Sequence, residues 1–156
     1  MKLEFDYWAC PRPMTGYWGS GQVYDRICKK LGKPDIVFGK TDNIPDDVKF
    51  IDLNNGYNWN DLPFDDNDFN FGYWDPPYPP AVDSLMKKEA LEIWRCCKSL
   101  AILHTYVYPI SWFIGAYRKA MIPVTFGPLK VVRILQVFEK KNKTIINENE
   151  VDNDEN

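Results

Sequence analysis

The alternation of strand-like and helix-like patterns is the feature that most constrains the fold of this chain. The clearest helix, after a proline-rich run, repeats apolar side chains every three or four residues. Helices are predicted at residues 20–31, 82–97 and 111–120, the last one capped by Ser111. Strands are predicted at residues 3–9, 35–38, 48–53, 69–74 and 100–108, and an antiparallel pair flanks the Gly127-Pro128 turn.

Strands that alternate with helices predict an α/β fold: a mostly parallel seven-stranded sheet with helices on both faces and a C-terminal antiparallel hairpin. No repeat or linker interrupts the pattern, so one domain is expected over residues 1–140, followed by an acidic, disordered tail at 141–156. Ligands of such sheets bind at the carboxyl ends of the strands, where the strand order reverses. The glycine-rich loop 16–21 and the proline-rich run 73–80 both follow predicted strands, so we expect them at that edge.

Within the proline-rich run, Asp75-Pro76-Pro77-Tyr78 combines groups that suit a flat ring bearing an amino group. Each proline restricts the residue before it, which stiffens the backbone from Asp75 onwards. The Asp75 carboxylate and the Pro76 carbonyl can then accept the two hydrogens of an amino group, and Tyr78 can stack on the ring. Such a run also occurs in polyproline II ligands and in simple turns, and these alternatives stay open on the residues alone.

The tetrapeptide resembles the catalytic motif of the S-adenosylmethionine-dependent amino methyltransferases, which modify exocyclic amino groups of DNA adenine or cytosine. This resemblance covers residues 3 to about 140 and implies a minimal class I methyltransferase, Rossmann-like fold with S-adenosyl-L-methionine as cofactor. It implies catalytic roles for Asp75, Pro76, Pro77 and Tyr78 and favours DNA adenine as substrate. The alternatives are an RNA guanine or a protein-glutamine methyltransferase on the same fold, or a non-catalytic nucleic-acid-binding subunit.

Gly19-Ser20-Gly21, at the start of a predicted helix, resembles the cofactor loop of the same family. Asp42, after the second strand, is the candidate for binding the ribose, and Asp52, after the third strand, could contact the adenine ring or cap a turn. The family usually carries an acid just before the glycine loop, where this chain has Thr15 and Gly16. That departure is the best support for the non-catalytic alternative.

The cysteine and histidine content bears on whether the chain could hold a metal ion. The four cysteines form no Cys-x-x-Cys pair and His104 is the single histidine, so no metal site is expected. His104 lies in a predicted strand and is expected to be a hydrogen-bonded structural residue, whereas Arg95 and Lys98 are expected to be solvated.

The net charge of −3 hides a mildly basic body, because five acids lie in the last ten residues. The sequence therefore allows nucleic acid as a partner, with DNA favoured over RNA by the resemblance. The chain leaves no room for a target-recognition domain, so a separate specificity subunit is one option. No signal peptide or membrane span is evident, which predicts a soluble, cytoplasmic protein.

Overall fold

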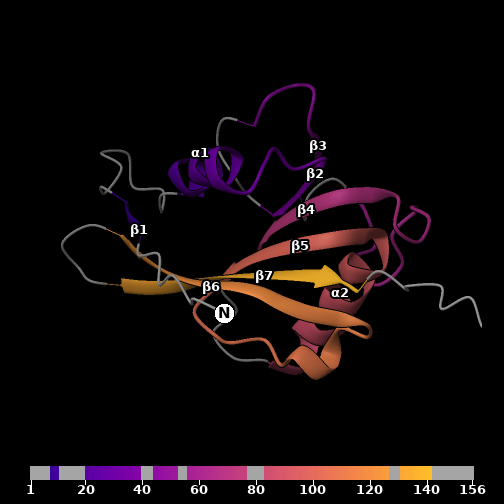
Figure 1. The fold of residues 1–156 in the computed structure, drawn as a ribbon. Helices are drawn as coiled ribbons and strands as arrows, with labels where there is room; N and C mark the ends of the chain where they lie inside the picture. Colours follow the sequence, from indigo (N-terminus) through magenta and orange to yellow (C-terminus); the bar gives the residue numbers. More distant parts are fainter. Residues whose placement is uncertain are drawn as a thin grey trace, which may run out of the picture.

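The structure is a computed structural model that describes residues 8–10, 20–39, 44–52, 56–76, 83–126 and 131–141 (Figure 1). Its elements in chain order are β1 (Trp8–Cys10), α1 (Ser20–Lys30), β2 (Ile36–Gly39), β3 (Lys49–Ile51), β4 (Phe69–Asp75), α2 (Asp83–Cys96), β5 (Cys97–His104), the 3₁₀ turn η1 (Ile110–Trp112), β6 (Ala116–Phe126) and β7 (Val131–Lys140). Neither α1 nor α2 combines the length and the apolar composition that a membrane-spanning helix needs.

The described strands form one seven-stranded sheet in the order β1-β6-β7-β5-β4-β2-β3. Strands β3, β2, β4 and β5 are all parallel, whereas β7 is antiparallel to both of its neighbours, β5 and β6. The predicted α/β fold and its C-terminal antiparallel pair are therefore confirmed, and the sheet that was predicted to be mostly parallel is mixed because of β7.

Strand β1 does not lie beside the strands that follow it in the sequence. It pairs in parallel with β6 at one edge of the sheet, where Figure 1 shows it next to the end of β6. Strands β6, β7 and β5 separate β1 from β4. At the usual spacing between strands this is a lateral distance of about 19 Å. The position of β1 alone therefore does not bring the glycine-rich loop to the end of β4, and loop residues 11–19 lie outside the described part of the chain.

The helix predicted at 111–120 is wrong. The only helical segment there is the short 3₁₀ turn η1, whose preceding residue, Pro109, provides no side-chain cap. Gly115, with φ +74°, then leads into β6, which pairs with β7 along its whole length. Tyr117 and Met121 are exposed while Ile122 and Val124 are buried. Long-range pairing with β7 decides the conformation, because a local helical pattern contributes little without a partner face.

Alternate side chains of the central strands enter two separate hydrophobic clusters. Val37 and Tyr73 belong to a cluster that contains Ile27 of α1. Phe38 and Trp74 belong to the other cluster, which contains residues of α2 such as Ile93. The alternation of strand side chains thus supplies a buried surface for each helix.

The loop that leads into β4 is held by Arg95, which the sequence analysis treated as solvated. Its guanidinium donates to the Phe64 carbonyl at 2.8 Å and to the Leu62 carbonyl at 3.1 Å. It also pairs with Glu92 at 2.6 Å and with Asp66 at 2.8 Å. Arg95 therefore fixes the loop, and that prediction is corrected. Lys98, in contrast, is exposed and donates to a side chain of β4.

Candidate functional site at the carboxyl ends of β2 and β4

The strand order reverses between β2 and β4. From β2 the chain continues outward to β3, and from β4 it continues in the opposite direction to β5. In the register of this pair, Phe38 lies opposite Trp74 and Gly39 lies opposite Asp75, so both strands end at the same level. A crevice outside the carboxyl ends at such a reversal is where open α/β sheets bind ligands. The sheet therefore brings Asp75 to the position where a ligand is expected.

Gly39 permits the close approach of β2 to the end of β4. Its φ is +107°, which side chains of L residues rarely adopt. A Cβ atom at this position would lie 2.2 Å from the carbonyl oxygen of Asp75 and 3.0 Å from its carbonyl carbon. Only glycine fits here without displacing the backbone of Asp75, a role that the sequence analysis did not assign to Gly39.

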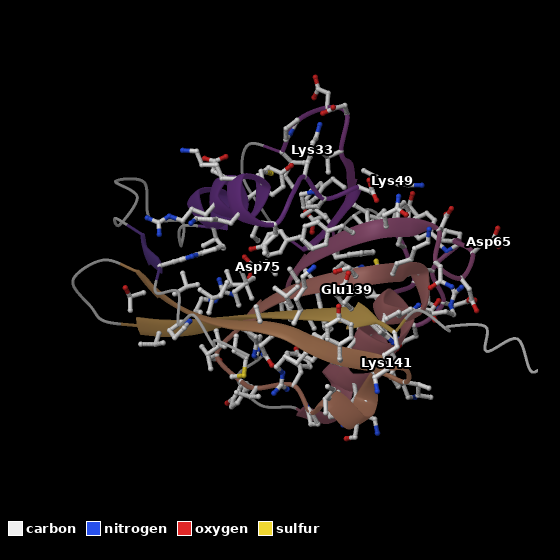
Figure 2. The ribbon with its side chains drawn as sticks, viewed as in Figure 1. Lys33, Lys49, Asp65, Asp75, Glu139 and Lys141 are labelled. Atoms are coloured by element: carbon white, nitrogen blue, oxygen red, sulfur yellow. The ribbon has the colours of Figure 1, made fainter. Side chains whose placement is uncertain are left out.

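The Asp75 side chain, which is labelled in Figure 2, is buried. It forms an ion pair with Arg133 of β7. Arg133 is 2% exposed and Asp75 is 9% exposed. The same guanidinium nitrogen of Arg133 donates to the Leu103 carbonyl of β5 at 3.0 Å. Burial raises the pKa of Asp75 above its ordinary value, while the charge and hydrogen bond of Arg133 oppose that shift.

Arg133 was missed by the sequence analysis, although a signal for it was present. It stands in the apolar run Val131 to Val137, on the same side of the strand as Leu135 and Val137. Those two residues belong to the buried cluster beneath α1. A cation at a buried position of an alternating strand needs a buried partner. The sequence alone does not show which acid that partner is, and the structure identifies it as Asp75.

The structure describes only one of the other three residues of the proposed catalytic motif. Pro76 is buried directly after β4. Pro77 and Tyr78 lie outside the described residues, so the predicted stacking role of Tyr78 stays a prediction.

The end of β5 lies beside this site, since Trp74 of β4 pairs with Ile102 of β5. His104 is the last residue of β5 and is buried, and its Nδ1 accepts the backbone N–H of Tyr106 at 3.0 Å. The hydrogen-bonded histidine expected from the sequence is thus found. The Tyr106 ring stacks on the imidazole, with centroids 5.2 Å apart, and is 63% exposed.

Gln136 of β7 fixes the loop after β5. Its amide nitrogen donates to the Tyr106 carbonyl, and its amide oxygen accepts the Tyr108 backbone N–H, both at 2.9 Å. These bonds explain why β5 ends at His104 rather than at Tyr108 as predicted, because the loop backbone is bonded to a side chain instead of a neighbouring strand. The loop therefore has a fixed path next to the end of β4.

Two of the predicted cofactor residues lie in α1, whose direction is set by its contacts with β4. The ring centroids of Tyr24 and Tyr73 are 6.5 Å apart, while Lys30 and Leu31, at the end of α1, line a cavity with Phe71 near the start of β4. Helix α1 therefore runs antiparallel to β4, and its first turn points towards the carboxyl edge of the sheet. The backbone of Ser20 and Gly21 forms that first turn.

Asp52 directly follows β3 and is half-buried. Because Phe38 pairs with Ile51 of β3 and with Trp74 of β4, the register places Asp52, Gly39 and Asp75 in one row across the three strand ends. The backbone N–H groups of a first helical turn, together with a carboxylate that accepts from hydroxyl or amino groups, are suited to binding S-adenosyl-L-methionine.

Gly19 and Asp42, the other two predicted cofactor residues, lie outside the described residues. Over the described part of the chain, no group of three or more His, Cys, Asp and Glu side chains could hold a metal ion.

Comparison with solved structures gives distant structural neighbours. A scan against protein-family models found no match, and a search of curated proteins found none either. A chain from the complex between the Haloferax volcanii Trm112 methyltransferase activator and a candidate methyltransferase is 13% identical, with a TM-score of 0.47 over 88% of this chain and 83% of that one. A candidate RNA methyltransferase from Pyrococcus horikoshii is 11% identical, with a TM-score of 0.48 over 91% and 76%. TrmN from Thermus thermophilus is 13% identical, with a TM-score of 0.44 over 89% and 45%.

These scores all lie below 0.5, so the function has to be argued from the side chains and strand order of this chain.

Proposed function

We propose that this protein transfers a methyl group from S-adenosyl-L-methionine to an exocyclic amino group of a nucleic-acid base, with DNA adenine as the first substrate to test. The observation that carries the proposal is the position of Asp75 and Pro76 at the end of β4, where the strand order reverses. The resemblance of Asp75-Pro76-Pro77-Tyr78 to the amino methyltransferase motif gives this position its chemical meaning.

On this proposal, the Asp75 carboxylate and the Pro76 carbonyl accept the two hydrogens of the amino group. These bonds direct the nitrogen lone pair away from the two acceptors, which orients it for reaction. The positive charge that develops on the nitrogen is stabilised by the two acceptors, because they are fixed before the reaction and need no reorganisation. Tyr78 stacks on the base, which contributes about 1–3 kcal/mol to binding. An amino group inside a duplex would have to be flipped out to reach these atoms.

The first turn of α1, with Ser20 and Gly21, and the carboxylate of Asp52 are the described groups that would hold the cofactor, together with Gly19 and Asp42. When bound, the cofactor would supply an electrophilic methyl group on a sulfonium; transfer would break the sulfur–methyl bond, leave a neutral thioether, and give a cationic amine that loses one proton afterwards. The row formed by Asp52, Gly39 and Asp75 supports this arrangement, because it aligns the cofactor side and the substrate side along one edge of the sheet.

The test compares Asp75→Ala, Asp75→Asn and wild type for transfer of labelled methyl groups to adenine-containing DNA and to RNA. Asp75→Ala should abolish transfer, while calorimetry should show cofactor binding largely unchanged. Asp75→Asn keeps one acceptor oxygen and should retain part of the activity. It also guards against misfolding, because the alanine variant leaves the buried Arg133 charge without this partner.

Asp65→Ala is the matched control, since Asp65 is exposed and precedes the opposite end of β4, as Figure 2 shows. It should methylate as wild type does. Equal transfer by wild type and Asp75→Ala would refute the proposed role of Asp75. No detectable cofactor binding at millimolar concentration would instead favour a non-catalytic nucleic-acid-binding subunit. Mass analysis of the modified product would identify the base and separate DNA from RNA as the substrate.

A further inference from the structure

We infer that Arg133 is the positioning residue of the proposed methyl-transfer site: it favours the ionised form of the Asp75 carboxylate against its burial and fixes its orientation at the end of β4. This inference rests on the proposed function for its consequence in catalysis. The effect of Arg133 on the titration of Asp75, however, can be measured without any methyl transfer.

The geometry of Arg133 joins three strands at the site. The residue lies on β7, its ion-pair partner Asp75 ends β4, and the carbonyl that shares its guanidinium nitrogen belongs to Leu103 on the intervening strand β5. A second hydrogen-bond partner on the rigid sheet restricts the positions that the guanidinium can occupy. The guanidinium therefore holds Asp75 Oδ1 at a defined place relative to β5.

Burial makes this partner necessary. Asp75 is 9% exposed, and an ionised carboxylate at such a site is disfavoured relative to the neutral acid. Protonated Asp75 would present a hydrogen on one oxygen and would lose its charge, so it would be a poorer acceptor for an amino group. The fixed positive charge of Arg133 favours the ionised form, since arginine stays protonated even when buried.

The ion pair also gives the two carboxylate oxygens of Asp75 different roles as hydrogen-bond acceptors. Oδ1 of Asp75 accepts from Arg133, which leaves the lone pairs of Oδ2 as the better acceptors for a substrate amino group. The amino group would then bridge Oδ2 and the Pro76 carbonyl. Arg133 thus acts through Asp75 and has no need to contact the substrate.

The other described titratable groups near Asp75 contribute less to its charge state. Tyr24 of α1 packs against Tyr73, two residues before Asp75, and burial raises the pKa of its hydroxyl so that it is neutral. His104 ends the neighbouring strand β5 but contacts Tyr106 and Tyr108, whose loop is fixed by Gln136. Arg133 is the charged group that forms an ion pair with Asp75. The neighbouring residues on β2 and β5, Gly39 and Leu103, carry no titratable side chain.

The experiment measures the titration of Asp75 by carbon-13 NMR of side-chain carboxyl groups, with the signal assigned by its absence in Asp75→Asn. Arg133→Met removes the charge at similar side-chain length, and Arg133→Lys keeps a charge. The matched control is Arg118→Met, because Arg118 is a partly buried arginine of β6 that donates to the Tyr108 carbonyl at 2.6 Å. The pH dependence of methyl transfer is measured for the same proteins.

In Arg133→Met, Asp75 should titrate at higher pH than in wild type, because the same burial remains without the opposing cation. Methyl transfer at neutral pH should fall by about 10²-fold through a lower kcat, as expected when an acceptor is displaced or protonated, and it should recover as the pH is raised. Arg133→Lys should titrate close to wild type, and Arg118→Met should change neither readout. Recovery at high pH is the result that a purely structural role of Arg133 does not produce.

An unchanged titration of Asp75 in Arg133→Met would overturn the inference. If Arg133→Met does not fold, Arg133→Gln makes the same comparison with a neutral hydrogen-bond donor in place. If wild type transfers no methyl group at all, the proposed function fails, whereas the NMR titration still decides whether Arg133 controls Asp75.

Discussion

Replacing Gly39 with alanine should disturb both the stability of the fold and the position of Asp75. The new Cβ atom would lie 2.2 Å from the Asp75 carbonyl oxygen, whereas ordinary contacts begin at 3.4 Å. One of the two backbones must therefore move by about 1 Å, because neither atom belongs to a flexible side chain. A shift of this size next to reacting groups can lower a rate by about 10²-fold.

The expected loss of stability in Gly39→Ala has two parts, and a substitution at a second glycine can separate them. An alanine at φ +107° carries conformational strain of about 1–2 kcal/mol, and the steric overlap adds about 1–3 kcal/mol. Gly32 has almost the same φ, +105°, but a Cβ atom there would meet nothing within 4 Å. Gly32→Ala should therefore show the strain without the overlap, and it should leave the end of β4 undisturbed.

Urea denaturation measures the stability difference between these two variants, and methyl transfer measures the displacement of Asp75. Gly39→Ala should be less stable than Gly32→Ala by about 1–3 kcal/mol and should lose most of its activity. If the two variants unfold at the same urea concentration and with the same slope, the close approach of β2 to Asp75 does not govern the site. Loss of stability without loss of activity would show that the Asp75 carbonyl has room to move.

Two further predictions concern side chains that fix loops near the sheet. Gln136→Leu should lower the free energy of unfolding by about 2 kcal/mol, because it removes both hydrogen bonds to the loop after β5. Gln136→Glu serves as the comparison variant, and a urea midpoint that is unchanged in Gln136→Leu would contradict this prediction. The Arg95 hydrogen bond holds the pKa of Glu92 below its ordinary value of 4.5, so the stability gained from this pair is present above pH 4.5 and is lost as the pH falls through the lowered pKa. Glu92→Gln should thus be less stable than wild type by about 1 kcal/mol at neutral pH. Chemical denaturation at a series of pH values should show this difference in stability shrinking under acidic conditions. A difference that does not depend on pH would refute the role of the Glu92–Arg95 pair.

Much of the central sheet could be predicted from local patterns. Strand β4 and helix α2 agree with prediction to within about one or two residues, because an apolar run and a repeat of three and four residues are strong signals. Strand β6 was misread as a helix because its conformation depends on pairing with β7, which no local pattern encodes. The position of β1 beside β6 depends in the same way on contacts between the two ends of the domain.

The site was predictable where a single segment carried it. Asp75 was selected from the proline-rich run, but its partner Arg133 is 58 positions later in the chain. The sequence shows that Arg133 occupies an apolar run, yet only the strand order β7-β5-β4 shows which acid it can reach. The role of Gly39 was hidden for a related reason, because its close contact is across the sheet with Asp75.

The edge position of β1 does not remove the glycine-rich loop from the proposed site, because α1 sets the position of the end of that loop. The Tyr24–Tyr73 contact and the hydrogen bond from the Asp35 N–H to the Phe71 carbonyl fix α1 antiparallel to β4. A helix of eleven residues spans about 16 Å, and the four residue steps from Phe71 to Asp75 span about 13 Å, so α1 is long enough to carry its first turn from the level of Phe71 to the carboxyl edge. Ser20 and Gly21 therefore reach the level of Asp75 through α1. The cofactor half of the proposed site depends on the packing of α1 against β4, and only its connection to the rest of the chain depends on β1.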